Sequence, residues 1–315
     1  MALRIAIMTD ETGWHTRQLQ AALRARGAVG RCVDLAACGI DTTASWHGLV
    51  IPGHGRELPD AVIVRGLAGG SFEQVTKRLG VLHALRELGV PVYNDARAIE
   101  RSVDKSMTSL LLHAARIAAP ATWATESPAQ LRRIAMREMA AGHALVLKPL
   151  FGSQGKHLRL VGEVDGVRHP IPDIEPDYAG LAYLQRFVPP VSAPGFDWRV
   201  LVVGGRAVAA MRRVSAHWVH NMAQGARCEP ARLQPGLTRL AEGAAQCLGM
   251  DYAGVDLIAA AHGPPIQVLE VNGVAAWQGL QRVTGFNIAR AIVDDLLDRK
   301  MGAASRPPLA ARRAR

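Results

Sequence analysis

Cysteine is scarce in this chain: there are four in 315 residues, and no two of them have the C-x-x-C spacing of a zinc site. We therefore expect free thiols in a reducing compartment, and a cytoplasmic protein. No apolar run approaches the roughly 18–20 residues that a membrane helix needs, which argues against a transmembrane chain. The N-terminus also lacks the apolar stretch and small-residue cleavage site of a secretory signal, so we expect none.

Lysine is also rare, since only five of the 37 basic residues are lysines. The net charge of +10 is unevenly spread, because residues 299–315 carry six basic side chains and no acidic one. No aromatic side chains alternate with these arginines, as a base-stacking surface would require. We expect a disordered basic tail over 301–315 and no nucleic-acid partner. Lysines inside ordered motifs are candidates for sites that need a compact positive charge.

The length predicts two or three modest units, and the first has alternating strand and helix patterns. Its helices are expected over 15–26 and 74–88, and its strands over 3–8, 30–35, 61–64 and 91–93. Strands separated by helices predict a small parallel α/β unit. The turn after the first strand has no G-x-G-x-x-G, so a dinucleotide-binding fold of the usual kind is not supported.

The rest of the chain favours antiparallel pairing. Expected hairpins join strands 198–203 and 207–211, around Gly204-Gly205, and strands 254–259 and 266–271. Further strands are expected over 145–147 and 183–188, and helices over 104–117, 237–248 and 287–298. The whole is therefore an α/β (α+β) chain.

The segment LEVN places Glu270 and Asn272 two apart on an expected strand, so both point to one face. Asp256 stands on the preceding strand of the same hairpin and can lie beside them. Carboxylate and amide oxygens suit Mg²⁺, which usually also takes substrate phosphates. The alternative is an ordinary polar outer face of an antiparallel sheet.

The segment LKPLFGSQGK joins a lysine to a glycine loop. A strand delivers Lys148, and Gly152 and Gly155 let the backbone bend over an anion. This is not the Walker pattern, because the lysine precedes the glycines. Lys105, near the start of its helix, could direct a second ammonium at the same phosphates. An ordinary turn and a solvated helix residue are the alternatives.

Two arginines stand near acidic and amide side chains in the third part of the chain. Asp197 and Arg199 share one strand face, Arg213 lies on the partner strand, and Asn221 follows it. Guanidinium groups facing carboxylates fit a site that handles carboxylate and phosphate together, although a surface ion pair would look the same. No G-x-S-x-G and no Cys/His signature supports a nucleophilic hydrolase.

Taken in order, these segments resemble the ATP-grasp superfamily, and specifically the RimK-like carboxylate–amine ligases that join glutamate to an amine or amino acid. The resemblance covers about residues 60–295 and is carried by DKSMTSLLL, VLKPLFGSQGK, LQRFV, DWRVLVVGGRAVAAMRR, HWVHNMAQGA and AGVDLI…VLEVNG. HWVHNMAQGA is similar to the tetrahydromethanopterin and lysine-biosynthesis branches. The resemblance implies an ATP-grasp fold, with an N-terminal pre-ATP-grasp domain over 1–97 and two α+β subdomains over 98–189 and 190–300.

The resemblance also implies roles for particular residues. The expected ATP-binding residues are Lys105, Lys148, Gly152, Ser153, Gln154, Gly155, Gln185, Arg186, Phe187, Val188 and Asp197. Of these, residues 185–188 would form the adenine hinge and Asp197 would hold the ribose. Asp256, Glu270 and Asn272 would bind Mg²⁺, or Mn²⁺ in its place. Arg199, Arg213 and Asn221 would stabilise the acyl phosphate and its tetrahedral adduct.

Three positions depart from the family pattern. Residues 273–277 read Gly-Val-Ala-Ala-Trp where the family often has Ser-Ser/Ala-Pro-Gly, Arg186 stands where the hinge usually has an acid, and Ala226 replaces a glycine. The first departure lies near the expected acceptor and acyl groups. Arg65 is a further candidate, for binding a substrate carboxylate.

The function implied is an ATP-dependent carboxylate–amine ligase that forms an amide through an acyl phosphate. We expect it to add L-glutamate, or another amino acid, to a small-molecule carboxylate or amine acceptor, with a pterin-type cofactor as the favoured acceptor. The resemblance also implies a homo-oligomer. The alternatives are a ligase that modifies a protein terminus and a non-catalytic ATP-binding protein.

Overall fold

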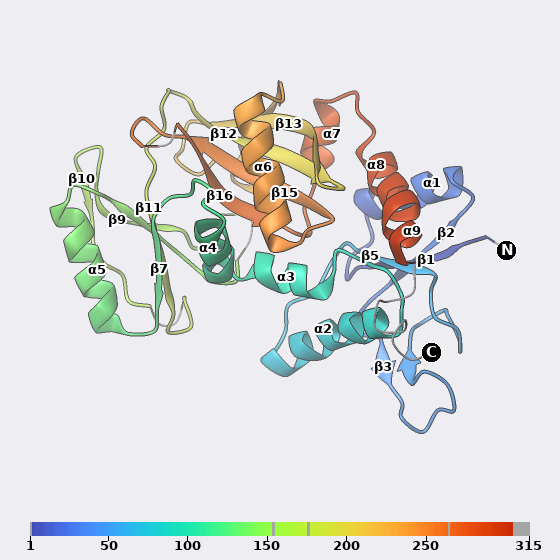
Figure 1. Ribbon diagram of the computed structural model, residues 1–315. Helices are drawn as coiled ribbons and strands as arrows, with labels where there is room; N and C mark the ends of the chain where they lie inside the picture. The colour runs from blue at the N-terminus through green and yellow to red at the C-terminus, as the bar shows by residue number, and fades with distance from the viewer. Residues whose placement is uncertain (1, 153–154, 175–176, 264, 305–315) are drawn as a thin grey trace.

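Three large β-sheets follow one another along the chain in the computed structural model (Figure 1), which describes residues 2–304 apart from 153–154, 175–176 and 264. A two-stranded sheet, β3 (Gly39–Ile40) and β4 (Leu49–Val50), is added to the first unit. The first large sheet is parallel and the other two are antiparallel, which confirms the predicted α/β (α+β) class.

The parallel sheet has the strand order β2-β1-β5-β6. Its strands are β1 (Arg4–Met8), β2 (Val29–Val33), β5 (Ala61–Val64) and β6 (Val92–Tyr93). Helix α1 (Trp14–Ala25) packs on one face and α2 (Phe72–Glu87) on the other. The central strands β1 and β5 are therefore buried on both sides, which is why their sequences are nearly continuous apolar runs.

The second sheet has the order β10-β9-β8-β11-β7. Its strands are β7 (Thr122–Thr125), β8 (Leu145–Lys148), β9 (Arg159–Val164), β10 (Val167–His169) and β11 (Ala182–Arg186). Helix α5 (Pro128–Ala140) covers one face, where its Leu131 and Ala135 join the core of β8, β9 and β11. Helices α3 (Ala96–Val103) and α4 (Lys105–Ala114) lead from the first unit into this sheet (Figure 1).

The third sheet has the order β14-β13-β12-β15-β16. Its strands are β12 (Gly195–Val203), β13 (Arg206–Ser215), β14 (Arg227–Ala231), β15 (Tyr252–Ala259) and β16 (Ile266–Asn272). Helix α6 (Pro235–Leu248) covers one face. On the other face Leu201 and Met211 share a core with Ile5 and Leu19, so this sheet is packed firmly against the first unit.

Both predicted hairpins are present. Gly204 and Gly205 form the β12–β13 turn, and both have positive φ, at 58° and 77°. Glycine adopts this conformation without the steric cost of a Cβ, which is why the pair marks the turn in the sequence.

The C-terminal region corrects the expected extent of the basic tail. Helices α7 (Gln278–Arg282) and α8 (Ile288–Asp294) are followed by a π-helical turn, η2 (Asp295–Lys300), and by α9 (Met301–Ala304). The last helix was expected to end at 298 and the tail to be disordered from 301. Instead the helical chain continues through residue 304. Just before α9, Arg299 and Lys300 donate to the buried Asp251 carboxylate at 2.9 and 2.7 Å. The rest of the expected tail lies outside the described residues.

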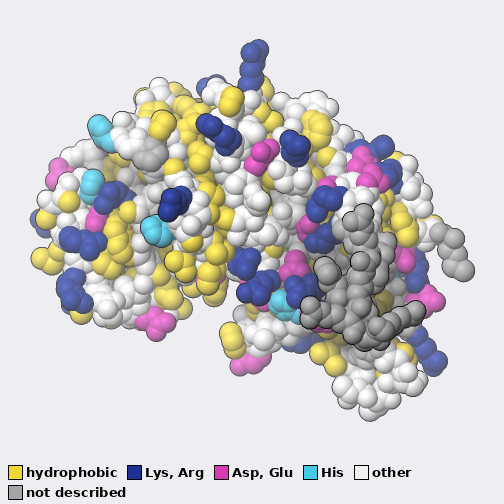
Figure 2. Space-filling model, in the orientation of Figure 1, with side chains coloured by type: hydrophobic (Ala, Val, Ile, Leu, Met, Phe, Trp, Pro, Cys, Tyr) yellow, Lys and Arg dark blue, Asp and Glu magenta, His cyan; other side chains and the backbone are white. Residues whose placement is uncertain are grey.

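Sequence patterns did not predict helix α5 or the β9–β10 hairpin. Signals for α5 were present, since Ser127 caps its first turn and Pro128 begins it. No helix in the described part of the chain is long and apolar enough to cross a membrane. Basic and acidic side chains are interspersed on the face shown in Figure 2.

Candidate active site

A cavity between the second and third sheets brings together most of the predicted site residues. Both sheets contribute, β8 and β11 from one and β12, β13, β15 and β16 from the other. The predicted residues in its wall are Lys105, Lys148, Gly152, Gly155, Gln185, Arg186, Phe187, Val188, Asp197, Arg213, Asn221, Asp256 and Glu270. Ser153 and Gln154 lie outside the described residues. Arg199 and Asn272 stand beside the wall, and Arg65 lies elsewhere, as described below.

The two lysines come from different elements and converge. Lys148 is the last residue of β8, and its Nζ donates to the Gln185 side-chain oxygen at 2.6 Å. Lys105 is the first residue of α4, and its Nζ donates to the Gly152 carbonyl at 2.8 Å and lies 3.6 Å from the Glu270 carboxylate. Burial lowers the pKa of Lys148 to about 8, with the charge of Lys105 adding to the effect and that of Glu270 opposing it.

The hinge residues lie at the end of β11, whose last two residues are Gln185 and Arg186. The N–H of Arg186 donates to the Ala121 carbonyl and that of Phe187 to the Ala144 carbonyl, so these two donors are engaged within the protein. Apolar positions on neighbouring elements form the wall around the hinge: Val146, Leu158, Ile258 and Leu269. The cavity at this end therefore suits a flat apolar group such as a base.

Arg186, which departs from the family's acidic hinge residue, has a partner of its own. Its Nη2 donates to the buried carboxylate of Glu138 on α5 at 2.6 Å. Burial would raise the pKa of Glu138, but Arg186 and Arg137 outweigh it and hold that pKa below its usual range. The positive charge that Arg186 brings to the hinge is thus neutralised by Glu138 on α5.

Two aspartates and two arginines alternate at the centre of the third sheet. Arg213 is paired across β12–β13 with Asp197, and its Nε donates to the Asp197 carboxylate at 2.7 Å. The Arg213 Nη2 also lies 3.0 Å from the Asp256 carboxylate, and Arg199 holds Asp256 through Nε and through Nη2, the latter at 2.8 Å. All four side chains are largely buried.

The balance between burial and the arginine charges shifts the two aspartate pKa values in opposite directions. Burial raises the pKa of Asp197 to about 6, against the opposing effect of Arg213. Burial also acts on Asp256, but there Arg199 and Arg213 together outweigh it and lower the pKa. Asp256 is therefore the firmly ionised carboxylate of the pair.

The three predicted metal ligands occupy adjacent strand positions. Asp256 lies directly opposite Glu270, and Asn272 lies opposite Gly254, to whose carbonyl it donates at 3.2 Å. No cluster of three His, Cys, Asp or Glu side chains suited to a metal occurs in the described ranges, since the third candidate ligand here is an amide. Two carboxylates and an amide oxygen fit Mg²⁺ shared with nucleotide phosphates. The oxygens of Asp256, however, already accept from two guanidinium groups.

Sequence reasoning missed His220 and Trp218, which also line the cavity. His220 is only 5% exposed, and its Nε2 is buried with no hydrogen-bond partner among the residues described. Burial, and then the charge of Arg213, lowers the pKa of His220 to about 4, so the ring is neutral near pH 7. Neighbouring Asn221 accepts from the Ala223 N–H and caps a short 3-10 helix, η1 (Met222–Gln224). The histidine could not be singled out from the sequence because it packs closely against Gly195, 25 residues earlier in the chain, where a Cβ would stand 2.7 Å from the His220 Nε2.

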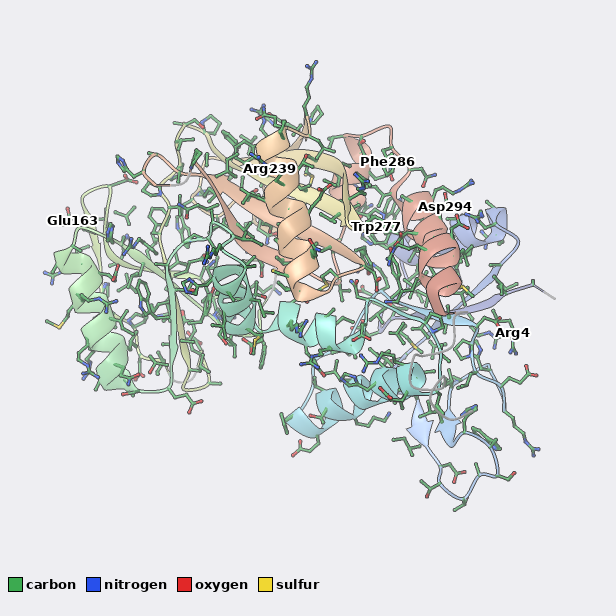
Figure 3. All side chains as sticks on the ribbon, in the orientation of Figure 1. Arg4, Glu163, Arg239, Trp277, Phe286 and Asp294 are labelled. Carbon is green, nitrogen blue, oxygen red and sulfur yellow. The ribbon has the colours of Figure 1, made fainter. Side chains whose placement is uncertain are left out.

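Arg65 is not part of the cavity wall. It follows β5, donates to the Val274 carbonyl at 3.0 Å, and holds its guanidinium 5.1 Å from the Trp277 ring centre. Figure 3 shows Trp277 where the third sheet meets the first unit. Arg65 thus contacts residues 273–277, the segment that departs from the family pattern. Arg199 links the two places, because its side chain packs against Gly254, which also adjoins Ala275.

The cavity between two antiparallel sheets, lined by lysines and carboxylates, is typical of an ATP-grasp protein, a class that uses ATP with Mg²⁺. Residues 102–296 match the RimK-like ATP-grasp domain, and residues 3–99 match the RimK PreATP-grasp domain. The chain belongs to the RimK-like family of ATP-grasp proteins and is an amide-forming ligase.

Similar proteins agree with this assignment. A tetrahydromethanopterin:α-L-glutamate ligase of Methanosarcina acetivorans is 30% identical over 92% of this chain and 97% of its own length. A probable α-L-glutamate ligase of Shewanella frigidimarina is 30% identical over 92% of this chain and 94% of its own. A solved structure of the ATP-grasp ligase PsnB with a minimal precursor has a TM-score of 0.69, at 22% identity, over 94% of this chain and 99% of that one. This last likeness shows the fold.

Proposed function

We propose that this protein uses ATP and Mg²⁺ to join L-glutamate, through its amino group, to the carboxylate of a small-molecule acceptor. The observation that carries the proposal is the convergence of Lys105 and Lys148 with Asp256 and Glu270 in one cavity. The relatives support glutamate as the added amino acid, since archaeal and bacterial members alike are named α-L-glutamate ligases. The archaeal names favour a pterin-linked acceptor.

In the first step, an acceptor carboxylate oxygen attacks the γ-phosphorus of ATP, which gives an acyl phosphate and ADP. Lys105 and Lys148 would face the phosphates and neutralise charge as the phosphoryl group moves. Asp256, Glu270 and Asn272 would hold Mg²⁺, which when bound neutralises the β- and γ-phosphate oxygens. Asp197 and the hinge would fix the ribose and the base.

In the second step, the glutamate amine attacks the acyl carbon, loses a proton and expels phosphate. Arg199, Arg213 and Asn221 would stabilise the oxyanion that forms. We assign Arg65 to a substrate carboxylate, because it is a cation at the carboxyl end of β5 and contacts residues 273–277.

The test is release of phosphate from ATP in the presence of Mg²⁺, glutamate and a panel of carboxylate acceptors that includes pterin-linked ones. We expect release to require both glutamate and one acceptor, with a product heavier by one glutamyl residue. Glu270→Ala should abolish it, whereas Glu229→Ala, which removes a surface carboxylate of β14, should leave it intact. Release that does not depend on glutamate would contradict the proposal.

A further inference from the structure

Asp256 is bound on both of its oxygens by cationic groups of the same sheet. Arg199 donates to both oxygens, and the Nη2 of Arg213 lies 3.0 Å from one of them. The Asp256 side chain is only 6% exposed, so no solvent replaces these contacts. A carboxylate offers about four lone-pair positions, and three are used here.

A divalent cation that binds Asp256 would compete with the Arg199 and Arg213 guanidinium groups for its oxygens. Both guanidinium groups are permanently charged, and like charges a few ångströms apart in a buried site repel strongly. A divalent cation and the full set of guanidinium contacts therefore compete for Asp256. One arginine has to withdraw when a cation arrives.

The geometry points to Arg199 as the group that withdraws. Arg213 keeps a second partner in any case, because its Nε donates to Asp197 at 2.7 Å. Arg199 has Asp256 alone as its ion-pair partner within the described chain. Arg199 already lies close to residues 273–277, because a Cβ at Gly254 would stand 3.0 Å from the Arg199 Cδ and 2.9 Å from the Ala275 Cβ.

We propose that Arg199 is a built-in counter-ion of Asp256 which a divalent cation displaces, so that cation binding turns this guanidinium toward residues 273–277 and the acyl centre. The inference rests on the proposed function, because it concerns the same site. The inference also sets an order of events: the Arg199 guanidinium becomes free to stabilise the acyl oxyanion only after the metal ion has bound. Arg199 therefore neutralises Asp256 in the metal-free protein and contacts the reacting group only in the metal-bound protein.

The experiment measures Mn²⁺ affinity of the full-length, nucleotide-free protein from the free Mn²⁺ paramagnetic resonance signal. Arg199→Gln removes the charge and keeps an N–H donor, so we expect Mn²⁺ to bind about tenfold more tightly or better, given the size of a buried charge–charge repulsion. The matched control is Arg212→Gln on neighbouring β13, which removes one of the two ion-pair partners of Glu229 and should leave Mn²⁺ affinity unchanged. Adding Asp256→Asn to Arg199→Gln should abolish the gain.

A second variant separates the charge of residue 199 from the other effects of the substitution. Arg199→Lys keeps the charge and should bind Mn²⁺ as weakly as the wild type. Equal or weaker Mn²⁺ binding by Arg199→Gln, or tighter binding by Arg199→Lys, would overturn the inference while leaving the proposed function in place. Failure of the wild type to bind Mn²⁺ even with ADP would instead overturn both.

Discussion

Nucleotide affinity should depend on pH through one lysine. Lys148 ends β8 inside the cavity, and burial lowers the pKa of its ammonium to about 8. Only the protonated form attracts a phosphate, and a bound phosphate raises the pKa again. Raising the pH from 7 to 9 therefore removes the charge from the free protein, and ADP has to bring a proton with it when it binds.

The size of the effect follows from that pKa. About nine-tenths of the Lys148 side chains are protonated at pH 7 and about one-tenth at pH 9, so ADP affinity should fall about tenfold between them. Near pH 8, ADP binding should take up about half a proton per site. The terminal phosphate, with a pKa near 6, is ionised throughout this range and adds little.

Titration calorimetry measures both quantities, since proton uptake appears as a dependence of the binding heat on the buffer. Lys148→Arg is the control, because a guanidinium stays charged over the whole range and should remove both the affinity change and the proton uptake. A wild-type affinity that is constant from pH 7 to 9 would refute the reasoning. So would a tenfold fall that persists in Lys148→Arg.

Further consequences concern stability. Glu138→Gln leaves Arg186 without its charged partner and should lower the free energy of unfolding in urea by about 1–2 kcal/mol. This figure is discounted for the partial exposure of Arg186. An unchanged unfolding midpoint would show that the Glu138–Arg186 pair does not stabilise the hinge. His15→Phe keeps the ring packing on Trp277 but leaves the N–H groups of Trp277 and Gln278 without their acceptor, so thermal unfolding should reveal a loss of about 2 kcal/mol. Burial, and then the charge of Arg65, lowers the pKa of His15 to about 4, so unfolding takes up a proton at this histidine. The free energy of unfolding should therefore decline as the pH falls from about 6.5 to 4. A decline equally steep in His15→Phe would contradict this assignment.

The relative positions of Asp256, Glu270 and Asn272 could be predicted from the sequence because the alternation of side chains along a strand depends only on neighbouring residues. Glu270 and Asn272 had to share a face, and the hairpin had to bring Asp256 opposite, as β15 and β16 do. Asp197 and Arg213 were placed on facing strands by the same reasoning. Each of these placements follows from a two-residue repeat and one tight turn.

Other features depend on contacts between distant segments, which a single sequence does not reveal. Arg186 could be seen as a departure from the family, but not its compensation by Glu138, 48 residues away on an unpredicted helix. The second contact of Arg213, with Asp256, requires β12, β13 and β15 to lie side by side. The binding of residues 273–277 by Arg65 and His15 likewise appears only when the first unit packs on the third sheet.

The measurement that tests the central claim most directly follows one oxygen atom. The acceptor found in the panel is labelled with ¹⁸O in its carboxylate and allowed to react with ATP, Mg²⁺ and glutamate, and the released phosphate is analysed by mass spectrometry. Activation as an acyl phosphate predicts that each released phosphate carries one ¹⁸O atom from the carboxylate. Unlabelled phosphate, or label recovered in AMP, would contradict the account.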